Sequence, residues 1–408
     1  MTKFDLILGG KKVGAEQYTD TLNPATNEVV GQAAVATPEH LDQAVQAANA
    51  AFATYSRLDD AALRDNCNKV ADVIEAHAEG EVGRVVTGGL INIPGDSMLD
   101  KMNYINNVDD SLRRFLVFEP RGQAQMSTNL LFPSTIEGAD AGMIVLQGDK
   151  AHGMSGSNCI CTVTVLLETG MLEMVEPETI VTLETPAGLV RARARCENGK
   201  CLDVTLDMTP SFVDQMDVEL IVDGVGKVVV DIAFGGIFYG LIDVSQFGID
   251  ISPDAARKLV ELGTAIHRSI NKQLGIRHPE LRGLEGLSYT MFTGFDKNGE
   301  LKGATILPPG RIDRSPCGTG NSARLAVMHA RKQIDVGSPV TAWSIIDSMF
   351  EVEIVKTTKI ADRPAILPRI KGRGWIYGIH QIGIDPTDPY PHGFKVSDCW
   401  GDAFDLLK

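Results

Sequence analysis

The sequence lacks the features that mark several special classes of protein. No stretch approaches the roughly 18 consecutive apolar residues of a membrane-spanning helix, and the N-terminus lacks the basic flank and apolar core of a secretory signal. Lysine and arginine total 38 against 53 acidic residues, which gives a formal net charge of −15. A nucleic-acid-binding surface needs clustered basic side chains. We therefore expect a cytoplasmic globular protein that binds neither membranes nor nucleic acids.

Cysteine is also scarce. Seven cysteines are scattered over 408 residues without a CxxC pair, which argues against a disulfide framework and against a zinc site. Cys196 and Cys201 flank an Asn-Gly turn, so a two-residue hairpin would place their sulfurs opposite each other, and a disulfide there is left open. The histidines lack metal-ligand spacing, so we predict no metal site and expect surface or core roles for His152, His267, His329 and His380.

Two short glycine-bracketed segments are the most informative feature of the chain. The first is MSGSN at 154–158 and the second is DRSPCGTGN at 313–321, and a helix-like run follows each. Glycines let a ligand approach the backbone, and the start of a helix offers unpaired N–H donors to an anion. Two such half-sites facing each other would hold one small carboxylate from both sides.

The remaining pattern predicts mixed helices and strands. Residues 4–35 alternate like short strands with a Gly9-Gly10 turn, and 37–53 predict a helix capped by Thr37, followed by a second helical stretch from about 59 to 77. Apolar runs at 159–168 and 322–333 predict the helices that follow the two glycine segments. Residues 181–194 and 218–243 are rich in Val and Ile and predict strands.

The N-terminal part resembles an aldehyde dehydrogenase. The resemblance covers LNPATNEVVGQAAVATPEHLDQAVQAANAAFATYSRL at 22–58 and the following ADVIEAHAE. No later stretch resembles the cofactor-binding sheet or the catalytic cysteine and glutamate segments of that family. This fragment is therefore expected to be non-catalytic.

From about residue 73 the sequence resembles the proline racemase superfamily, which includes hydroxyproline epimerases and 3-hydroxyproline dehydratases. Its motifs occur in family order: AHAEGEVGRVVTGGLINIPGDSMLDKM, LRRFLVFEPRG, MSGSN, LLETGM, DIAFGGIFYGLID and DRSPCGTGNSARLA. The string EAHAEGE fits both families, so we predict an N-terminal fragment at 1–75 and a catalytic region at 76–408. The resemblance implies an α/β (α+β) fold like that of diaminopimelate epimerase. In that fold two similar lobes, each a curved sheet around a central helix, hold the site between them, and here a small strand-helix appendage precedes them.

Members of this superfamily exchange or remove the α-proton of an amino acid without a cofactor, normally with two facing cysteines. This chain keeps the second cysteine, Cys317, and has Ser155 at the first position. A thiol at a helix N-terminus becomes partly ionised, so Cys317 is predicted to be the general base. A serine hydroxyl needs a partner to take its proton, so Ser155 is expected to donate or relay a proton or to orient the ligand. The alternatives are a buried core thiol and a helix N-cap, respectively.

The resemblance also implies how a substrate would be held. Asp313 corresponds to the carboxylate that binds the substrate's amine, although bracing Arg314 or a turn is an alternative role. Many relatives have a histidine where this chain has Ser157, so that imidazole is absent from the first segment. The substrate carboxylate is expected to lie over backbone N–H groups of Gly156, Ser157, Asn158, Gly318, Thr319 and Gly320.

The serine and cysteine pairing favours dehydration of trans-3-hydroxy-L-proline to pyrroline-2-carboxylate. In that substrate the α-hydrogen and the leaving hydroxyl lie on one ring face, so one residue can take the proton and return it to the leaving oxygen. The alternative is a 4-hydroxyproline 2-epimerase or proline racemase, which needs an acid or base on each face, and both activities can share one site. An alternative of another class is a non-catalytic protein that assembles with an aldehyde dehydrogenase. The expected partner is a small amino-acid substrate, and a homodimer is left open.

Overall fold

The structure, a computed structural model, describes residues 3–22, 26, 28–55, 71–89, 93–281, 284–385 and 387–400, with side chains except at 51–55. The chain divides into two compact units, Met1–Asn68 and Lys69–Lys408. Each unit is therefore described separately.

The first unit combines short strands with one helix. Its hairpin turns at Gly9-Gly10, where φ is +54° and +76°, values that glycine adopts without strain. The His40 N–H donates to Thr37 Oγ1 and so caps the first turn of the helix. The predicted strands, turn and capped helix are confirmed. The elements are β1 (Lys3–Phe4), β2 (Leu6–Leu8), β3 (Lys11–Val13), β4 (Tyr18–Leu22), β5 (Val29–Ala34) and α1 (Pro38–Tyr55).

The first strand of the second unit, β6 (Ala71–Ala78), corrects one prediction. The sequence predicted a helix from 59 to 77, of which 59–70 lie outside the described residues and 71–77 form this strand. Val73 and Ile74 point to opposite faces of the sheet and both are buried. A strand buried on both faces lacks the alternation of apolar and polar residues, so its sequence is easily read as a helix. Residues 71–75, which we had assigned to the N-terminal fragment, therefore belong to the sheet of the second unit.

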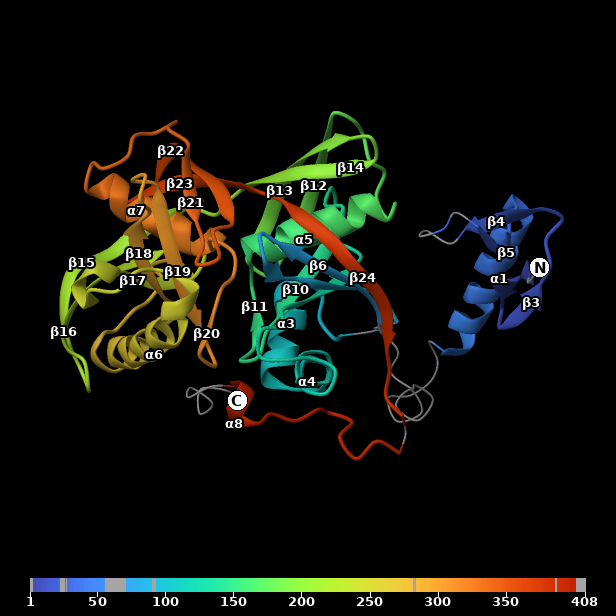
Figure 1. Cartoon of the computed structure of the whole chain (residues 1–408), viewed down its shortest axis with the longest axis horizontal. Helices are drawn as coiled ribbons and strands as arrows, with labels where there is room; N and C mark the ends of the chain where they lie inside the picture. Colours follow the sequence, from blue (N-terminus) through green and yellow to red (C-terminus); the bar gives the residue numbers. More distant parts are fainter. Residues whose placement is uncertain are drawn as a thin grey trace. The chain divides into compact units, whose positions relative to one another are not determined.

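The second unit consists of two lobes (Figure 1). The first lobe is a curved sheet around helix α5, and α3 and α4 cover one side of it. Its elements are β6, β7 (Glu81–Val82), β8 (Arg84–Gly88), α3 (Met98–Asn107), α4 (Ser111–Val117), β9 (Thr128–Phe132), β10 (Ala141–Leu146), β11 (Ala151–His152), α5 (Gly156–Glu168), β12 (Glu178–Thr185), β13 (Gly188–Glu197), β14 (Lys200–Asp207) and β24 (Gly374–Ile382).

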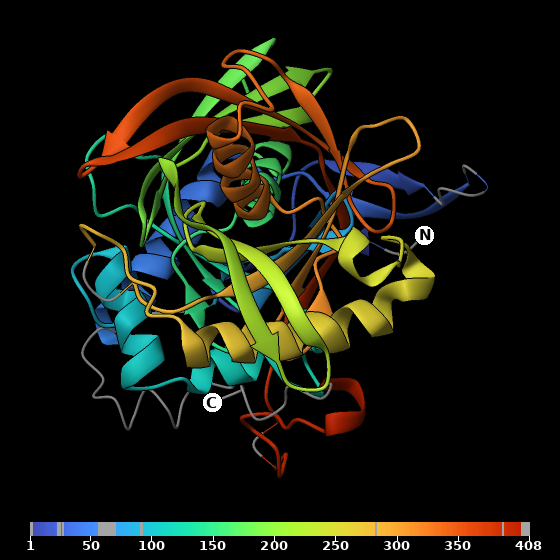
Figure 2. The ribbon, with the colours of Figure 1, turned by 90° about the vertical axis from the view of Figure 1, so that its left-hand side faces the viewer.

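The second lobe is built around helix α7, and α6 runs along the outside of its sheet (Figure 2). Two short 3-10 helices, Val244–Phe247 and Pro253–Ala255, precede α6, and the short helix α8 (Ser397–Trp400) ends the described chain. The elements of this lobe are β15 (Ser211–Val222), β16 (Gly226–Phe234), β17 (Phe238–Asp243), α6 (Ala256–Gln273), β18 (Tyr289–Phe295), β19 (Leu301–Leu307), β20 (Arg311–Ile312), α7 (Gly318–Ala330), β21 (Val340–Trp343), β22 (Met349–Ile360) and β23 (Arg363–Gly372).

Both lobes repeat one arrangement of strands. β10 pairs antiparallel with β9 and β11 and parallel with β12, and β19 pairs in the same way with β18, β20 and β21. In each lobe a two-residue strand, β11 or β20, leads through a loop into the 13-residue central helix. The predicted fold of two similar lobes around central helices is confirmed. This repeat brings the two glycine segments to equivalent places.

The lobes are joined through β23. Its end at Arg369–Gly372 pairs with β14 of the first lobe, and its middle at Ala365–Ile366 pairs with β15 of the second. Between these two pairings, opposite Leu367 and Pro368, the neighbouring strand β22 has a register shift that leaves Val355 as an extra residue. Such a β-bulge bends a strand locally. β23 therefore changes partner where its neighbour is kinked.

The hairpin of β13 and β14 confirms the predicted Asn-Gly turn. Cys196 and Cys201 are directly opposite each other, and both are free, buried thiols. Asn198 and Gly199 have φ of +54° and +72°, as a tight hairpin turn requires. These cysteines therefore fill the core of the first lobe without forming a disulfide.

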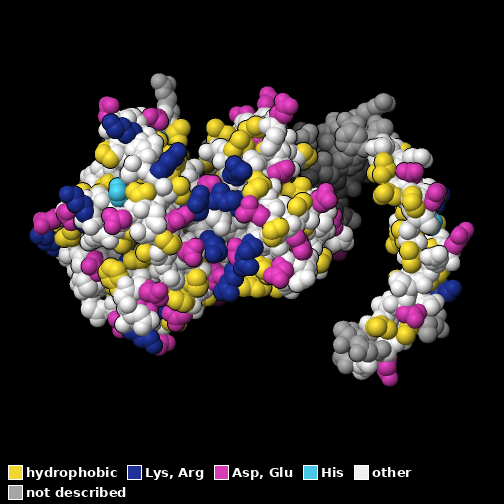
Figure 3. All heavy atoms as spheres, turned by 90° about the horizontal axis from the view of Figure 1, so that it is seen from above, with side chains coloured by type: hydrophobic (Ala, Val, Ile, Leu, Met, Phe, Trp, Pro, Cys, Tyr) yellow, Lys and Arg dark blue, Asp and Glu magenta, His cyan; other side chains and the backbone are white. Residues whose placement is uncertain are grey.

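Charged side chains of both signs are interspersed on the face of the second unit that Figure 3 shows. Ion pairs on the strands include Arg193 with Asp207 and Arg369 with both Asp207 and Glu353. Within the residues the structure describes, no helix is both long enough and apolar enough to cross a membrane.

Candidate active site

The two glycine segments meet where the lobes face each other. Each forms the loop between a short strand and a central helix, and Gly156 and Gly318 are the first residues of these helices. A Cβ atom added to Gly156 would lie 3.5 Å from the Cα atom of Gly318, so the two helix starts are in contact. The unpaired N–H groups of both helices therefore point into one region.

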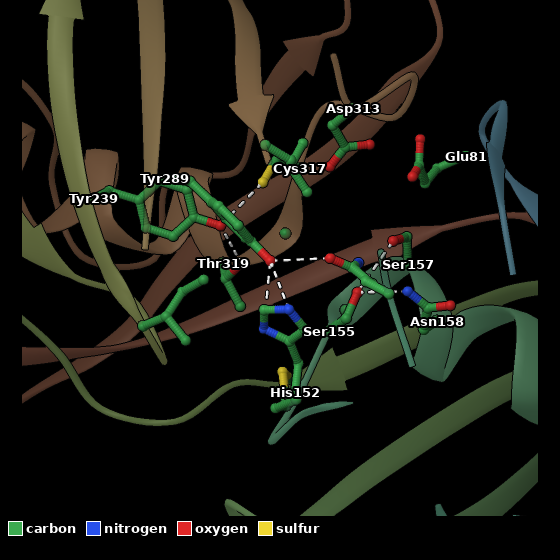
Figure 4. A pocket seen from close by; sticks show the side chains of 16 residues that line it. Glu81, His152, Ser155, Ser157, Asn158, Tyr239, Tyr289, Asp313, Cys317 and Thr319 are labelled. Carbon is green, nitrogen blue, oxygen red and sulfur yellow. Dashed lines mark hydrogen bonds between the residues drawn. The ribbon is translucent and has the colours of Figure 1, made fainter. Parts of the chain in front are cut away.

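A cavity opens beside this contact and is lined from both lobes (Figure 4). Eight of the nine predicted site residues line it, and Gly320 lies just behind Cys317, where an added Cβ would be 3.0 Å from the sulfur. The lining residues are Glu81, Gln147, His152, Met154, Ser155, Gly156, Ser157, Asn158, Ile237, Tyr239, Tyr289, Leu307, Asp313, Cys317, Gly318 and Thr319.

Cys317 is the residue immediately before α7, and its backbone is unusual. Its φ of +69° lies in the left-handed region, which a non-glycine residue rarely adopts. Two bonds hold this turn: the Cys317 N–H donates to Ser315 Oγ at 3.1 Å, and the Asn321 side-chain amide donates to the Cys317 carbonyl at 3.0 Å. The conformation directs the sulfur into the cavity, where the hydroxyl of Tyr239 lies 3.4 Å away (Figure 4).

The surroundings of Cys317 oppose the partial ionisation that a helix start would favour. Its side chain is buried, and burial together with the nearby charge of Asp313 raises its pKa to about 12. Burial disfavours a charged sulfur more strongly than the start of a helix favours it. A substrate that changes the charge of Asp313 would therefore also change the acidity of this thiol.

Ser155 is the residue immediately before α5, so it occupies the N-cap position, which was the alternative to a catalytic role. Its side chain makes no capping hydrogen bond. Instead, its Oγ accepts a hydrogen bond from Asn158 Nδ2 at 2.9 Å and lies 3.4 Å from Ser157 Oγ. The hydroxyl is thus held at the cavity wall by side chains of its own helix.

Asp313 belongs to a buried cluster of charges. Its Oδ1 accepts hydrogen bonds from the backbone N–H and the hydroxyl of Ser315, both at 2.8 Å. Glu81 lines the same cavity and accepts from Arg311 Nη1 at 2.6 Å. Burial and the charge of Glu81 raise the pKa of Asp313 to about 7, although Arg311 opposes the shift. Two carboxylates beside one guanidinium make this end of the cavity suited to a cation such as an ammonium group.

Several further cavity residues escaped the sequence interpretation, among them two tyrosines and a histidine. Tyr239 and Tyr289 are direct neighbours on the parallel strands β17 and β18, and burial raises the pKa of both well above the usual value. The Tyr239 hydroxyl is 2.6 Å from Thr319 Oγ1. His152, for which we expected a surface or core role, lies in the cavity wall. Its position three residues before Ser155 was the available signal.

The arrangement suits proton transfer at a carbon atom. The cavity presents a thiol and a hydroxyl from opposite lobes, N–H donors for a carboxylate at the two helix starts, and carboxylates for an amine. Among the described residues, His, Cys, Asp and Glu side chains form no group of three or more that could hold a metal ion.

Two family models match the chain. The proline racemase model matches residues 73–395, and the aldehyde dehydrogenase family model matches residues 12–84. The two matches overlap at 73–84, which includes the whole string EAHAEGE that fits both families.

Similar proteins cover nearly all of the second unit. A 4-hydroxyproline 2-epimerase of Allorhizobium ampelinum is 46% identical over 342 residues, which is 83% of this chain and 99% of the relative. A 4-hydroxyproline 2-epimerase of Rhizobium etli is 48% identical over 337 residues, 82% of this chain and 98% of the relative.

Two solved structures closely resemble the structure of this chain. A hydroxyproline epimerase from Agrobacterium vitis, with bound trans-4-hydroxy-L-proline, has a TM-score of 0.79 and 46% identity over 83% of this chain and 98% of its own. A probable proline racemase from Agrobacterium radiobacter K84, with bound carbonate, has a TM-score of 0.80 and 46% identity over 83% of this chain and all of its own.

Proposed function

Because this chain belongs to the proline racemase family, we propose that it inverts the α-carbon of 4-hydroxyproline, and so acts as a 2-epimerase. The observation that carries the proposal is that Cys317 and Ser155, each directly before a central helix, line one cavity from opposite lobes. The relatives named above support this reaction more directly than the dehydration that the sequence led us to expect.

The proposed substrate is held at both of its charged ends. Its carboxylate lies over the N–H groups at the starts of α5 and α7, and its ring ammonium lies beside Asp313 and Glu81. As the α-proton leaves, negative charge moves onto the carboxylate, where the N–H donors are already oriented. These contacts therefore strengthen in the transition state and lower the barrier.

The ammonium group of the substrate also lowers the pKa of the Cys317 thiol. Its positive charge offsets the negative charge of Asp313, which is one of the two causes of the raised pKa of the thiol. The thiolate then takes the α-proton from one ring face, breaking the Cα–H bond and forming S–H. Ser155 delivers a proton to the opposite face, breaking its O–H bond and forming the new Cα–H bond. The serine oxygen then regains a proton and Cys317 loses one by exchange with solvent.

Dehydration of trans-3-hydroxy-L-proline is the second candidate, and the unequal pair of Ser155 and Cys317 favours it. The α-hydrogen and the hydroxyl of that substrate lie on one face, so the Cys317 thiolate alone can remove the proton and return it to the leaving oxygen. Loss of water gives an enamine that tautomerises to pyrroline-2-carboxylate. This reaction needs no acid on the face of Ser155.

One experiment tests both candidates. The full-length protein is incubated in deuterated buffer with trans-4-hydroxy-L-proline or with trans-3-hydroxy-L-proline. We expect cis-4-hydroxy-D-proline carrying deuterium at Cα from the first, measured by NMR. An imine product from the second, detected with o-aminobenzaldehyde, would establish the dehydratase. Absence of turnover with both substrates would contradict the proposal and favour a non-catalytic role.

A further inference from the structure

The wall of the cavity that carries Ser155 also carries an imidazole that the reaction described above does not use. His152 lies on β11, three residues before Ser155, and both line the cavity. Three residues of chain span about 10 Å at most. In the view of Figure 4, His152 and Ser155 lie on one side of the cavity and Asp313 and Glu81 on the other. The imidazole of His152 thus lies on the same wall of the cavity as the Ser155 hydroxyl, which needs a proton acceptor in order to act as a base.

Asp149 fixes the protonation pattern of this imidazole. Its Oδ1 lies 2.9 Å from His152 Nε2, and only 13% of its side chain is exposed. Burial alone would raise the pKa of Asp149, but the charge and hydrogen bond of His152 hold it at about 2, so the carboxylate is ionised. An ionised carboxylate only accepts hydrogen bonds, so Nε2 carries a hydrogen. In the neutral ring, Nδ1 then has a free lone pair.

Tyr289 offers a hydrogen-bond acceptor to the imidazole ring of His152 when that ring is protonated. Its hydroxyl donates to Gln147 Oε1 at 3.0 Å and lies 3.4 Å from each ring nitrogen of His152. Because the one phenolic proton is directed to Gln147, the oxygen presents lone pairs to the imidazole. An imidazolium at position 152 would thus have Asp149 at Nε2 and the Tyr289 oxygen at the ring edge, 3.4 Å from Nδ1 as well as from Nε2.

The Ser155 hydroxyl lacks a neighbouring base among the described side chains that hydrogen-bond to it. Its Oγ already accepts a hydrogen bond from Asn158, and the only other partner within 3.5 Å among the described side chains is Ser157 Oγ. Another serine hydroxyl is too weak a base to take the Ser155 proton near neutral pH. A serine can act as a base only if its own proton has a destination.

We propose that His152, oriented by Asp149, receives the hydroxyl proton of Ser155 through one bridging water when Ser155 abstracts the α-proton. The Cα–H bond breaks, the proton moves to Ser155 Oγ, and the original serine proton reaches His152 Nδ1. Cys317 supplies the proton that completes inversion on the other face, and both groups are restored by exchange with solvent. His152 is thus a positioning and relay residue specific to one ring face. This inference rests on the proposed epimerase function.

The test measures each ring face separately. The two epimers, trans-4-hydroxy-L-proline and cis-4-hydroxy-D-proline, present the α-hydrogen to opposite faces, and NMR in deuterated buffer gives the initial rate of α-proton loss from each. We expect His152→Gln, which still donates to Asp149 but cannot take up a proton, to slow one epimer at least about tenfold. That epimer should be the one that Ser155→Ala slows. Loss from the other epimer should stay within about threefold.

Two further variants keep the test decisive. Asp149→Asn, which is isosteric, should slow the same epimer if His152→Gln does not fold. His267→Gln replaces an imidazole outside the cavity, bonded to the Leu287 carbonyl, and should leave both rates unchanged. Equal slowing of both epimers by the variants at 152 and 149, or no slowing of either, would overturn the inference. If the wild-type protein exchanges neither epimer, the proposed function itself fails.

Discussion

Ser155 and Cys317 occupy the same position in the two lobes, because each is the last residue before a 13-residue central helix. Their backbones nevertheless differ. Ser155 is extended, with φ of −152°, whereas Cys317 has φ of +69°. A repeated fold has therefore placed two chemically different side chains at equivalent points, and only the cysteine requires a conformation that must be held by its surroundings.

Replacing the thiol should abolish proton transfer. In Cys317→Ser the hydroxyl is far less acidic than the thiol, so epimerisation and dehydration should fall about 100-fold to 10,000-fold. The measurement is α-proton loss from both hydroxyproline epimers. Cys399→Ser removes an exposed cysteine and serves as the control. Turnover of Cys317→Ser within tenfold of the wild type would exclude Cys317 as the base.

Changing Ser155 should alter the balance of the two candidate reactions. Ser155→Ala should eliminate 4-hydroxyproline epimerisation, because inversion needs a proton from the face opposite Cys317, and should lower dehydration only moderately. Ser155→Cys restores a pair of thiols and should raise epimerisation relative to dehydration. The quantity to measure is the ratio of the two rates in deuterated buffer. A ratio that is the same in both variants and the wild type would show that the serine does not set the reaction.

Substrate capture should depend on pH through Asp313. Burial and Glu81 raise the pKa of this carboxyl to about 7, so it is neutral below pH 7 and charged above it. The ammonium of the substrate needs the charged form, and kcat/KM should therefore fall about tenfold per pH unit below pH 7. Initial rates at low substrate concentration between pH 5.5 and 8.5 measure this.

The variant Glu81→Gln provides the matching control for that profile. Without the neighbouring negative charge, the pKa of Asp313 should fall, and the inflection in kcat/KM should move to lower pH. An inflection that stays near pH 7 in this variant would assign it to another group.

Removing residues 1–68 should preserve activity. Every residue that lines the cavity lies in the unit Lys69–Lys408, which has its own core and sheet. The comparison is of kcat and KM between the truncated and full-length proteins, with near-UV circular dichroism to verify folding. A folded but inactive truncation would show that the first unit contributes to the site.

The sequence was sufficient to predict the two loops because each is a short, local motif. It did not reveal Glu81, Tyr239 or Tyr289, because these reach the cavity through long-range strand pairing. Tyr239 and Tyr289, for example, become neighbours only through the parallel register of β17 and β18. Register between distant strands depends on the whole sheet and leaves no local pattern.

The structure differs from the sequence-based expectations at two further places, residues 71–77 and Cys317, and each difference has a physical cause. Residues 71–77 were predicted as helix because a strand buried on both faces has no alternating pattern, and because this stretch fits two families. The sequence did not reveal the raised pKa of the Cys317 thiol, because a helix start is visible in sequence whereas depth of burial is not. Sequence thus indicated which groups meet, and the structure was needed to show their environment.

The change of partner along β23 bears on how a substrate enters. Cys317 and Asp313 are 5% and 7% exposed, so parting of the lobes would give a ligand readier access to them. Leu367 and Pro368 lie between the pairings to the two lobes, opposite the extra residue Val355. We expect this point to act as the hinge, since bending there separates the lobes without breaking the ladder on either side. Turnover would then be gated by opening of the lobes, a motion of microseconds to milliseconds.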